Sequence, residues 1–170
     1  MNEERRKAVL NAGPIIHLSE VNCFNAIEIF HTVVPKAVYN EVVRYGKPCS
    51  KELKESKTEV IGLTEDEKVL AKRLCDLYQI EVGEAEAIVI CISRNYKLFL
   101  TDDKDAREVG ELHDTEVHGS LGIILRAYRE HIFEYDHMKN GIYSLYRKSS
   151  LFMTQRVYER VIRMVEEYRV

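Results

Sequence analysis

The chain has 170 residues, of which 45% are hydrophobic and 31% are charged. This size and composition are typical of one soluble globular domain with a single core. No apolar run approaches the roughly 20 residues needed to span a bilayer, so no membrane contact is expected. The formal net charge of −3 excludes the strongly basic balance of many nucleic-acid-binding proteins. Any contact with RNA must therefore depend on a local basic patch or on a metal ion.

The cysteines and the opening residues indicate a reducing compartment. Cys23, Cys49, Cys75 and Cys91 form no CxxC pair, which gives no support to a zinc site or a disulfide framework. We expect four reduced thiols, mostly buried. The polar opening run Met1–Lys7 is not followed by the apolar segment of a signal peptide. We therefore expect a cytoplasmic protein.

The first part of the chain alternates short apolar runs with helical patterns. A strand is predicted at residues 8–10, stopped by Gly13-Pro14, and residues 15–30 predict one or two short helices. A β-branched run at 32–34 ends at Pro35, which suits the first turn of a helix that continues to a C-cap at Gly46. An extended segment is expected at residues 59–63.

From Thr64 onward the pattern is mainly helical. Thr64-Glu65-Asp66-Glu67 is a capping box that begins a helix, and Gly83 marks the break before a nearly all-apolar helix at 85–92. A strand at 97–101 is followed by a polar helix at 105–112, a short strand at 115–117 and a helix at 119–131. An amphipathic helix ends the chain.

Short strands that alternate with helices predict an α/β fold with a mostly parallel central sheet, covered by helices on both faces. We expect a frayed N-terminus at residues 1–7, a core domain at 8–131, and a helical extension at 132–170 packed on the same domain. In parallel sheets, binding sites form beyond the carboxyl ends of the strands. Reactive residues at those ends are therefore the candidates.

Polar side chains stand at the predicted strand ends and helix starts. Asn11 follows the first strand, Thr101-Asp102-Asp103 follows the strand at 97–101, and Glu84 lies in the first turn of an apolar helix. Glu41 is a further candidate. Carboxylates that converge on one crevice repel one another unless a hard cation neutralises them, and Mg²⁺ or Mn²⁺ is the natural occupant. Such an ion activates water for phosphodiester hydrolysis.

Each candidate also has a simpler explanation. Asp102 and Asp103 suit a strand-to-helix turn with an N-cap, and Glu84 suits the favourable end of a helix dipole. Glu41 fits a solvated helix position. Glu86 lies about 200° from Glu84 around the helix, so the two side chains cannot both face one site.

Five segments together resemble the PIN domain, and specifically the prokaryotic branch related to the toxin ribonucleases of toxin–antitoxin pairs. They occur in the family's order and span residues 8–131, with the stretch from Gly83 to Ala127 the most specific. The segments are Asn11–Leu18, Val34–Val42, Gly83–Ile88, Leu100–Arg107 and Val117–Ala127. The resemblance implies a three-layer α/β/α sandwich and a ribonuclease that uses Mg²⁺ or Mn²⁺.

The resemblance also implies roles for particular residues and partners. The family's acidic positions correspond to Asn11, Glu41, Glu84 and Asp103, with Asp102 beside the last, and Thr101 matches a hydroxyl that supports a metal-bound water or a neighbouring carboxylate. Arg107 and Arg126 are candidate phosphate contacts, although solvated helix charges are the simpler reading. Related proteins pair into dimers, and the toxin-like members bind a small antitoxin protein.

Asn11 is the main departure from the family, which has an aspartate at the end of the first strand. An amide supplies a neutral oxygen, so metal affinity should fall. The alternative hypothesis is therefore a catalytically attenuated or inactive PIN-fold module that binds RNA or protein. A phosphoacceptor receiver domain is disfavoured, because its paired aspartates follow the first strand and here they follow a late one.

Overall fold

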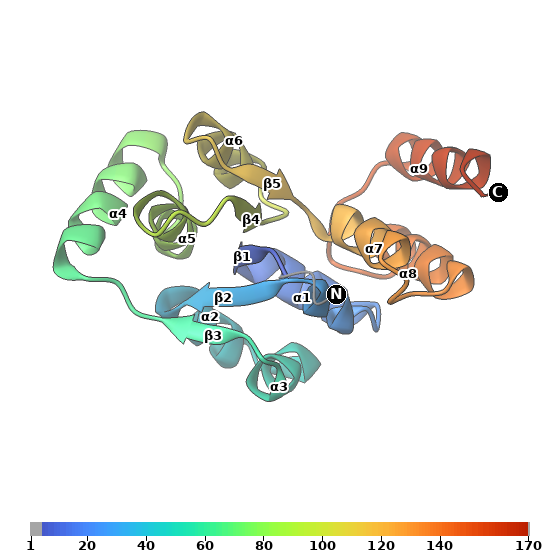
Figure 1. The fold of residues 1–170 in the computed structure, drawn as a ribbon, viewed down its shortest axis with the longest axis horizontal. Helices are drawn as coiled ribbons and strands as arrows, with labels where there is room; N and C mark the ends of the chain where they lie inside the picture. Colours follow the sequence, from blue (N-terminus) through green and yellow to red (C-terminus); the bar gives the residue numbers. More distant parts are fainter. Residues whose placement is uncertain (1–4, 170) are drawn as a thin grey trace.

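A single parallel sheet forms the centre of the protein in the computed structural model, which describes residues 5–169 (Figure 1). Its strand order is β3-β2-β1-β4-β5, and every neighbouring pair is parallel. The strands are β1 (Lys7–Leu10), β2 (His31–Pro35), β3 (Glu59–Ile61), β4 (Leu98–Leu100) and β5 (Glu116–His118). Residues 1–4 of the predicted frayed segment lie outside the described residues, and Lys7 already belongs to β1.

Helices connect and cover the strands. They are α1 (Ala12–Glu20), the 3-10 helix η1 (Phe24–Ile29), α2 (Lys36–Tyr45), α3 (Lys47–Glu55), α4 (Glu65–Tyr78), α5 (Val82–Ser93), α6 (Lys104–Leu112), α7 (Ser120–Arg129), α8 (Tyr135–Arg147) and α9 (Gln155–Glu167). The capping box predicted at Thr64 is present, since Thr64 Oγ1 accepts from Glu67 N–H and Glu67 Oε2 accepts from Thr64 N–H.

Successive strand residues point to opposite faces of the sheet and divide the core in two. Ala8 and Leu10 belong to a cluster with α1, η1, α2, α3, α7, α8 and α9, whereas Val9 belongs to a cluster with α4, α5 and α6. In β4, Leu98 and Leu100 join the first cluster and Phe99 the second. Strands buried on both faces read as continuous apolar runs, as this sequence does. The predicted α/β/α sandwich is confirmed.

The sheet is wound in both directions from its centre. The chain steps from β1 outward to β2 and β3, then crosses over so that β4 pairs with the other side of β1 and β5 follows. Loops that leave β1 and β4 therefore diverge at the carboxyl edge between them. Such a switch point is where ligands bind in open parallel sheets.

Several boundaries differ from the sequence-based expectations. Gly13 and Pro14 lie inside the first turn of α1, where a proline needs no hydrogen-bond donor. Gly83 lies inside α5, and the break after α4 is instead at Gln79, whose backbone is left-handed. A Cβ at Gly83 would lie 2.9 Å from Val38 Cγ2, so this glycine permits close contact between α5 and α2.

Two helices were not predicted individually. Among the described side chains of α3, the hydrophobic ones that join the core are Cys49 and Leu53, too few for a helical pattern to be visible. Helix α8 lies within the expected extension and packs on α7 through Met138, Ile142 and Leu145. Within residues 5–169, the structure contains no helix with the length and apolar character needed to cross a membrane.

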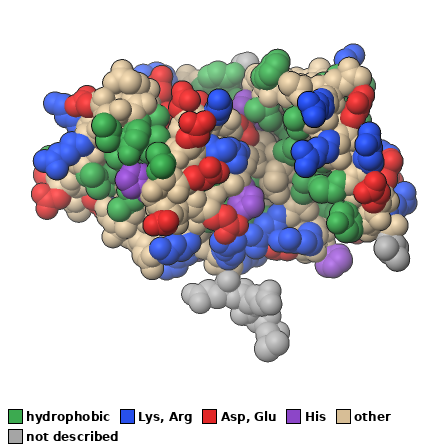
Figure 2. Space-filling model, turned by 90° about the horizontal axis from the view of Figure 1, so that it is seen from above, with side chains coloured by type: hydrophobic (Ala, Val, Ile, Leu, Met, Phe, Trp, Pro, Cys, Tyr) green, Lys and Arg blue, Asp and Glu red, His purple; other side chains and the backbone are tan. Residues whose placement is uncertain are grey.

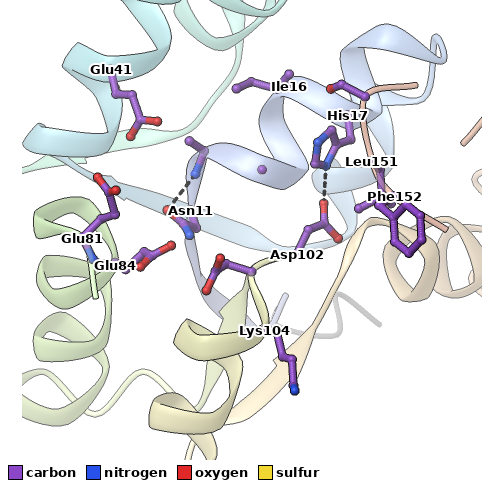
Figure 3. A pocket seen from close by; sticks show the side chains of 14 residues that line it. Asn11, Ile16, His17, Glu41, Glu81, Glu84, Asp102, Lys104, Leu151 and Phe152 are labelled. Carbon is purple, nitrogen blue, oxygen red and sulfur yellow. Dashed lines mark hydrogen bonds and ion pairs between the residues drawn. The ribbon is translucent and has the colours of Figure 1, made fainter. Parts of the chain in front are cut away.

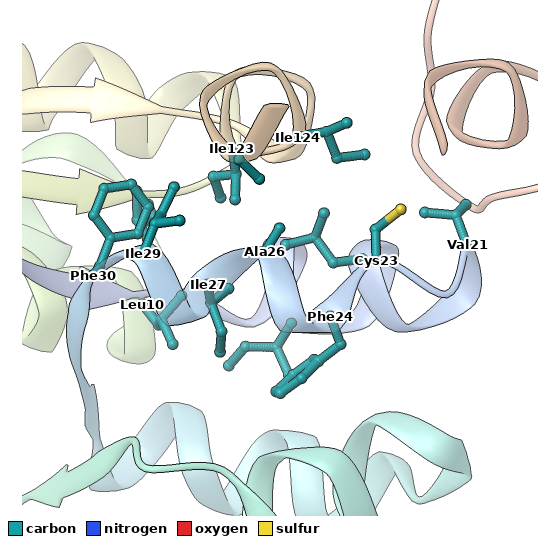
Figure 4. Packing of buried hydrophobic residues seen from close by; sticks show 14 of the residues in the cluster. Leu10, Val21, Cys23, Phe24, Ala26, Ile27, Ile29, Phe30, Ile123 and Ile124 are labelled. Carbon is teal, nitrogen blue, oxygen red and sulfur yellow. The ribbon is translucent and has the colours of Figure 1, made fainter. Parts of the chain in front are cut away.

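The C-terminal helices continue the core on the α1 side of the sheet. Figure 4 shows Ile123 of α7 directed at the η1 segment near Ala26, with Cys23 on the same side. Helix α8 lies over Cys23, because a Cβ built on Gly141 would come within 2.7 Å of Cys23 Sγ. Both residues are fully or almost fully buried. The docking of α8 therefore depends on a glycine at this position.

We expect Gly141→Ala to destabilise the protein by about 1–3 kcal/mol, despite the better helix propensity of alanine, because the added methyl overpacks the contact with Cys23. Chemical denaturation measures the change. The variant Cys23→Ala leaves room for that methyl, so in the double variant the cost of Gly141→Ala should largely disappear. An equal cost of Gly141→Ala in both backgrounds would contradict this account of the packing.

Candidate active site

A pocket of about 670 Å³ lies at the carboxyl edge between β1 and β4 (Figure 3). It receives side chains from the ends of both strands, from the starts of α1, α5 and α6, from α2, and from the segment between α8 and α9. Its polar lining residues are Asn11, His17, Glu41, Glu81, Glu84, Asp102, Asp103, Lys104 and Ser150. The structure thus brings the predicted residues Asn11, Glu41, Glu84, Asp102 and Asp103 together.

Asn11 is buried and its amide orientation is fixed by the helix that follows. Its Oδ1 accepts a hydrogen bond from Ala12 N–H at 2.9 Å, which caps α1. Its Nδ2 consequently faces the strand edge and donates to Thr101 Oγ1 at 2.9 Å. The amide also hydrogen-bonds Glu84, where it lowers the pKa of that carboxyl. Asn11 therefore presents N–H donors to the pocket, where an aspartate would present an oxygen.

Glu84 stands at the third position of α5, and its Oε2 accepts from Glu81 N–H at 3.0 Å. Burial raises the pKa of its carboxyl most, and the nearby charges of Asp103 and Glu81 raise it further, against the lowering hydrogen bonds from Glu81 N–H and Asn11. An anion held among anions in a partly buried pocket is a recognised mark of functional sites. Figure 3 shows Glu84 directed toward Asn11.

Glu41 approaches the same pocket from α2. Partial burial raises the pKa of its carboxyl, the charge of Glu81 raises it further, and Arg44 lowers it. Its carboxylate lies beside the start of α5, since a Cβ built on Gly83 would be 3.7 Å from Glu41 Oε2. Glu86 turns away as expected and its Oε2 accepts from Ala37 N–H, which caps the start of α2.

Asp103 caps α6 and leaves part of its carboxylate available. Its Oδ1 accepts from Ala106 N–H at 2.8 Å, and its own N–H donates to Thr101 Oγ1 at 3.1 Å. Thr101 is fully buried and receives hydrogen bonds from both Asn11 and Asp103. This hydroxyl therefore joins the ends of β1 and β4.

Asp102 lines the pocket, but protein groups already surround its carboxylate. Oδ1 accepts from Ser120 N–H at 2.7 Å, and Oδ2 accepts from Ser120 Oγ at 2.6 Å and from His17 Nδ1 at 2.7 Å. Its side chain is only 8% exposed. These contacts join the end of β4 to α1 and to the start of α7. The geometry thus favours a structural role for Asp102.

Neither of the two arginines predicted to contact phosphate lines the acidic pocket. Arg107 is directed at carbonyl oxygens of Val117 and Thr101, each at 3.4 Å, below the pocket edge. Arg126 lies in the last turn of α7, pairs with Glu130 at 2.6 Å and covers the ring of Phe30. Since Asp102 contacts the first turn of α7, Arg126 is at the opposite end of that helix from the pocket.

Sequence reasoning missed four parts of the site. Glu81 immediately precedes α5. The sequence pattern places the start of that helix after Gly83, which leaves Glu81 outside the predicted first turn. His17 and Ser120 belong to the quoted motifs, yet only the fold shows that both contact Asp102. The segment Ser150–Phe152 carries no motif, and it reaches the pocket because α8 folds back along α7.

The donor set suits a hard divalent cation, since it consists of carboxylate oxygens. Among residues 5–169, no three histidine, cysteine or acidic side chains stand close enough to hold an ion by themselves. Magnesium usually takes one or two carboxylates directly and keeps several waters. Glu84 and Asp103, whose charges influence each other, fit that arrangement, with Glu41 and Glu81 placed to contact bound water.

The acidic pocket lies at the switch point of the parallel sheet, where ligands bind in folds of this class. A model of the PIN domain matches residues 7–167, nearly the whole chain including α8 and α9. The protein therefore belongs to the PIN-domain family. A search of curated proteins found no match to the chain.

We expect Glu84→Gln to raise the unfolding free energy near pH 7 by up to about 1 kcal/mol when no divalent metal is present. Burial makes ionisation of Glu84 less favourable in the folded chain than in the unfolded chain, so its contribution is most favourable below its ordinary pKa of 4.5 and is lost as the pH rises through the raised pKa. Denaturation at several pH values measures the change.

The control for this experiment is Glu86→Gln, the same change two residues away on the same helix. Glu86 caps α2 and does not line the pocket, so its replacement should bring no gain in stability. If Glu84→Gln destabilised the protein at neutral pH, the unfavourable ionisation assigned to Glu84 would be wrong.

Proposed function

We propose that this protein is a metal-dependent ribonuclease that hydrolyses phosphodiester bonds of RNA with Mg²⁺ or Mn²⁺ as cofactor. The observation that carries the proposal is the position of Glu84. Its carboxylate, with a raised pKa, faces Asp103 across the switch point of a PIN-domain sheet. Such a charge arrangement costs stability, and a divalent cation bound between the carboxylates offsets that cost.

The residues around the pocket have separate roles in this proposal. Glu84 and Asp103 hold the ion, while Glu41 and Glu81 accept hydrogen bonds from its waters. Thr101 and Asn11 keep the ends of β1 and β4 together and orient Asp103 and Glu84. When bound, the ion supplies an acidified water and neutralises charge on the phosphoryl group. Lys104, at the rim, is the side chain placed to attract the phosphate backbone.

Asn11 supports a second candidate function, a catalytically attenuated PIN-fold module that binds RNA or protein. Its Nδ2 occupies the position of a possible oxygen ligand and its hydrogen bond to Glu84 already compensates part of that negative charge. A cation gains less at such a site than at one with a further carboxylate. The pocket, however, keeps four carboxylates besides Asp102, which favours the enzyme.

The resemblance to toxin ribonucleases supports a more specific setting. In this setting the protein is a cytoplasmic endoribonuclease toxin, active as a homodimer and inhibited by a small antitoxin protein. Figure 2 shows acidic and basic side chains interspersed on one broad face, without a large patch of either sign. Together with the net charge of −3, this supports binding of RNA through the pocket and its immediate surroundings rather than through a general basic surface.

We expect saturable binding of Mn²⁺ and Mg²⁺ by calorimetry, and RNA cleavage that a chelator abolishes. Asp103→Asn should reduce cleavage by about 100-fold or more and weaken metal binding, because it removes a ligand charge. Asparagine still caps α6 through its side-chain oxygen, so the fold should be retained. Asp105→Asn, the same change at an α6 position outside the pocket, should cleave like the wild type. Absence of metal binding and cleavage in the wild type would exclude the enzyme.

We expect Asn11→Asp to tighten metal binding by about tenfold or more and to increase cleavage. Aspartate retains the cap on Ala12 N–H, and its second oxygen replaces Nδ2 beside Thr101 and Glu84. Without metal the same variant should be less stable, since the new charge repels Glu84. Calorimetry and thermal unfolding with and without Mn²⁺ test both effects. Unchanged metal affinity would favour the binding module over an attenuated nuclease.

A further inference from the structure

We propose that Phe152 is a stacking platform for an unpaired base of the RNA at the rim of the acidic pocket. The inference rests on the ribonuclease proposed above and concerns how its substrate is held. It comes from the C-terminal segment between α8 and α9, which contributes Ser150, Leu151 and Phe152 to the wall of the acidic pocket.

This segment has a defined position against the core. Ser150 N–H donates to Glu20 Oε2 at 2.7 Å, and Ser150 Oγ donates to Glu20 Oε1 at 2.9 Å, which joins the segment to the end of α1. Leu151 N–H donates to Ser149 Oγ, and Thr154 Oγ1 caps α9 by accepting from Val157 N–H. The residues on either side of Phe152 are therefore held by hydrogen bonds and by packing of Leu151 and Met153.

Phe152 itself is directed outward. Its side chain is 88% exposed, more than any other large hydrophobic residue within residues 5–169. The neighbours Leu151 and Met153 both pack against the core. A ring exposed in this way on a fixed segment loses the free energy of burial and gains no contact inside the protein. Its exposure is explained if the ring has a partner outside the chain.

The ring lies where two hollows meet. It lines the acidic pocket and also a neighbouring pocket of about 420 Å³ that contains Arg107, His118 and Leu121. Asp102 separates the two hollows and lines both. Figure 3 shows Phe152 beside Asp102 and across the pocket from Glu41 and Glu81. A nucleotide next to a phosphate held at Glu84 and Asp103 is therefore within the pocket that this ring lines.

An unpaired base matches this ring better than a duplex does. Aromatic side chains bind single-stranded RNA by stacking on splayed bases, an interaction that every base can make. Bases in a duplex stack on one another and offer no free face. A duplex also needs many phosphate contacts, and a protein with a net charge of −3 has no excess of basic residues to make them. Of the cations near the ring, Arg107 is directed at backbone carbonyl oxygens, so Lys104 is the one placed for a phosphate.

The sequence contains no tryptophan, which permits a direct optical test. The test variant is Phe152→Trp combined with Asp103→Asn, which prevents cleavage. A base that stacks on the single indole lowers its fluorescence. The control is Tyr168→Trp in the same background, since Tyr168 is 80% exposed and lines neither pocket. Both are titrated with a short unstructured RNA and with the same RNA annealed to its complement.

We expect the unpaired RNA to quench the fluorescence of the tryptophan at 152 and not of that at 168, with little response to the duplex. In the Asp103→Asn background, Phe152→Ala should weaken RNA binding by about tenfold to a hundredfold, and Phe152→Tyr by less than about twofold, because tyrosine keeps the ring. Equal quenching by duplex and single strand would overturn the assignment of the ring to an unpaired base. Unchanged affinity of Phe152→Ala would overturn the stacking role.

The failures of the two proposals can be told apart. Suppose that the wild type cleaves RNA, that Asp103→Asn does not, and that RNA leaves the fluorescence of the tryptophan at 152 unchanged. The ribonuclease proposal is then supported and the stacking role of Phe152 is wrong. If the wild type neither binds nor cleaves RNA, both proposals fail. Self-association that Phe152→Ala abolishes, without any response to RNA, would assign the ring to a protein contact and overturn the inference. Sedimentation measures that outcome.

Discussion

The parallel pairing of β1 with β4 is the constraint on which the site depends. These strands are about 90 residues apart in sequence, yet Ala8, Val9 and Leu10 stand opposite Leu98, Phe99 and Leu100, and the ladder continues where Asn11 N–H donates to Leu100 O. The register places Asn11 beside Thr101, so the first polar residue after each strand meets the other. Buried apolar runs on both faces fix this register, because a slip by one residue would exchange the two faces of each strand.

Side chains that hydrogen-bond to the first turns of helices form a pocket at this edge of the sheet. The N-caps Asn11 and Asp103 begin α1 and α6 directly at the strand ends, and Glu84 closes the first turn of α5 against Glu81 N–H. Asp102, bound by Ser120 and His17, holds α7 and α1 in place on the other side. The same carboxylates that begin helices thus converge on one volume. Burial raises the pKa of both Glu41 and Glu84, and the charge of Glu81 raises each of them further.

The C-terminal helices contribute to the site as well as to the core. Helix α8 packs on α7, and its close contact with Cys23 requires a glycine at position 141. The chain then returns along α1, where Ser150 contacts Glu20. This return brings Phe152 to the rim of the pocket. Sites of this kind combine a rigid sheet edge with a connecting segment that varies more freely between relatives. The segment is therefore a natural place for substrate preference to reside.

The sequence by itself determined the α/β class, the parallel sheet and most strands, because apolar runs, capping signals and β-branched residues are local properties. It also placed Asn11, Glu84 and Asp103 at strand ends and helix starts, where a parallel sheet gathers such residues. It did not reveal α3, whose buried face is too small to form a pattern, or the true role of Gly83, which depends on contact with Val38. The tertiary structure alone decided which atom of Asn11 faces the pocket, that Asp102 is occupied by Ser120 and His17, and that Phe152 reaches the rim. These features depend on contacts between residues far apart in sequence, and no local pattern records such contacts.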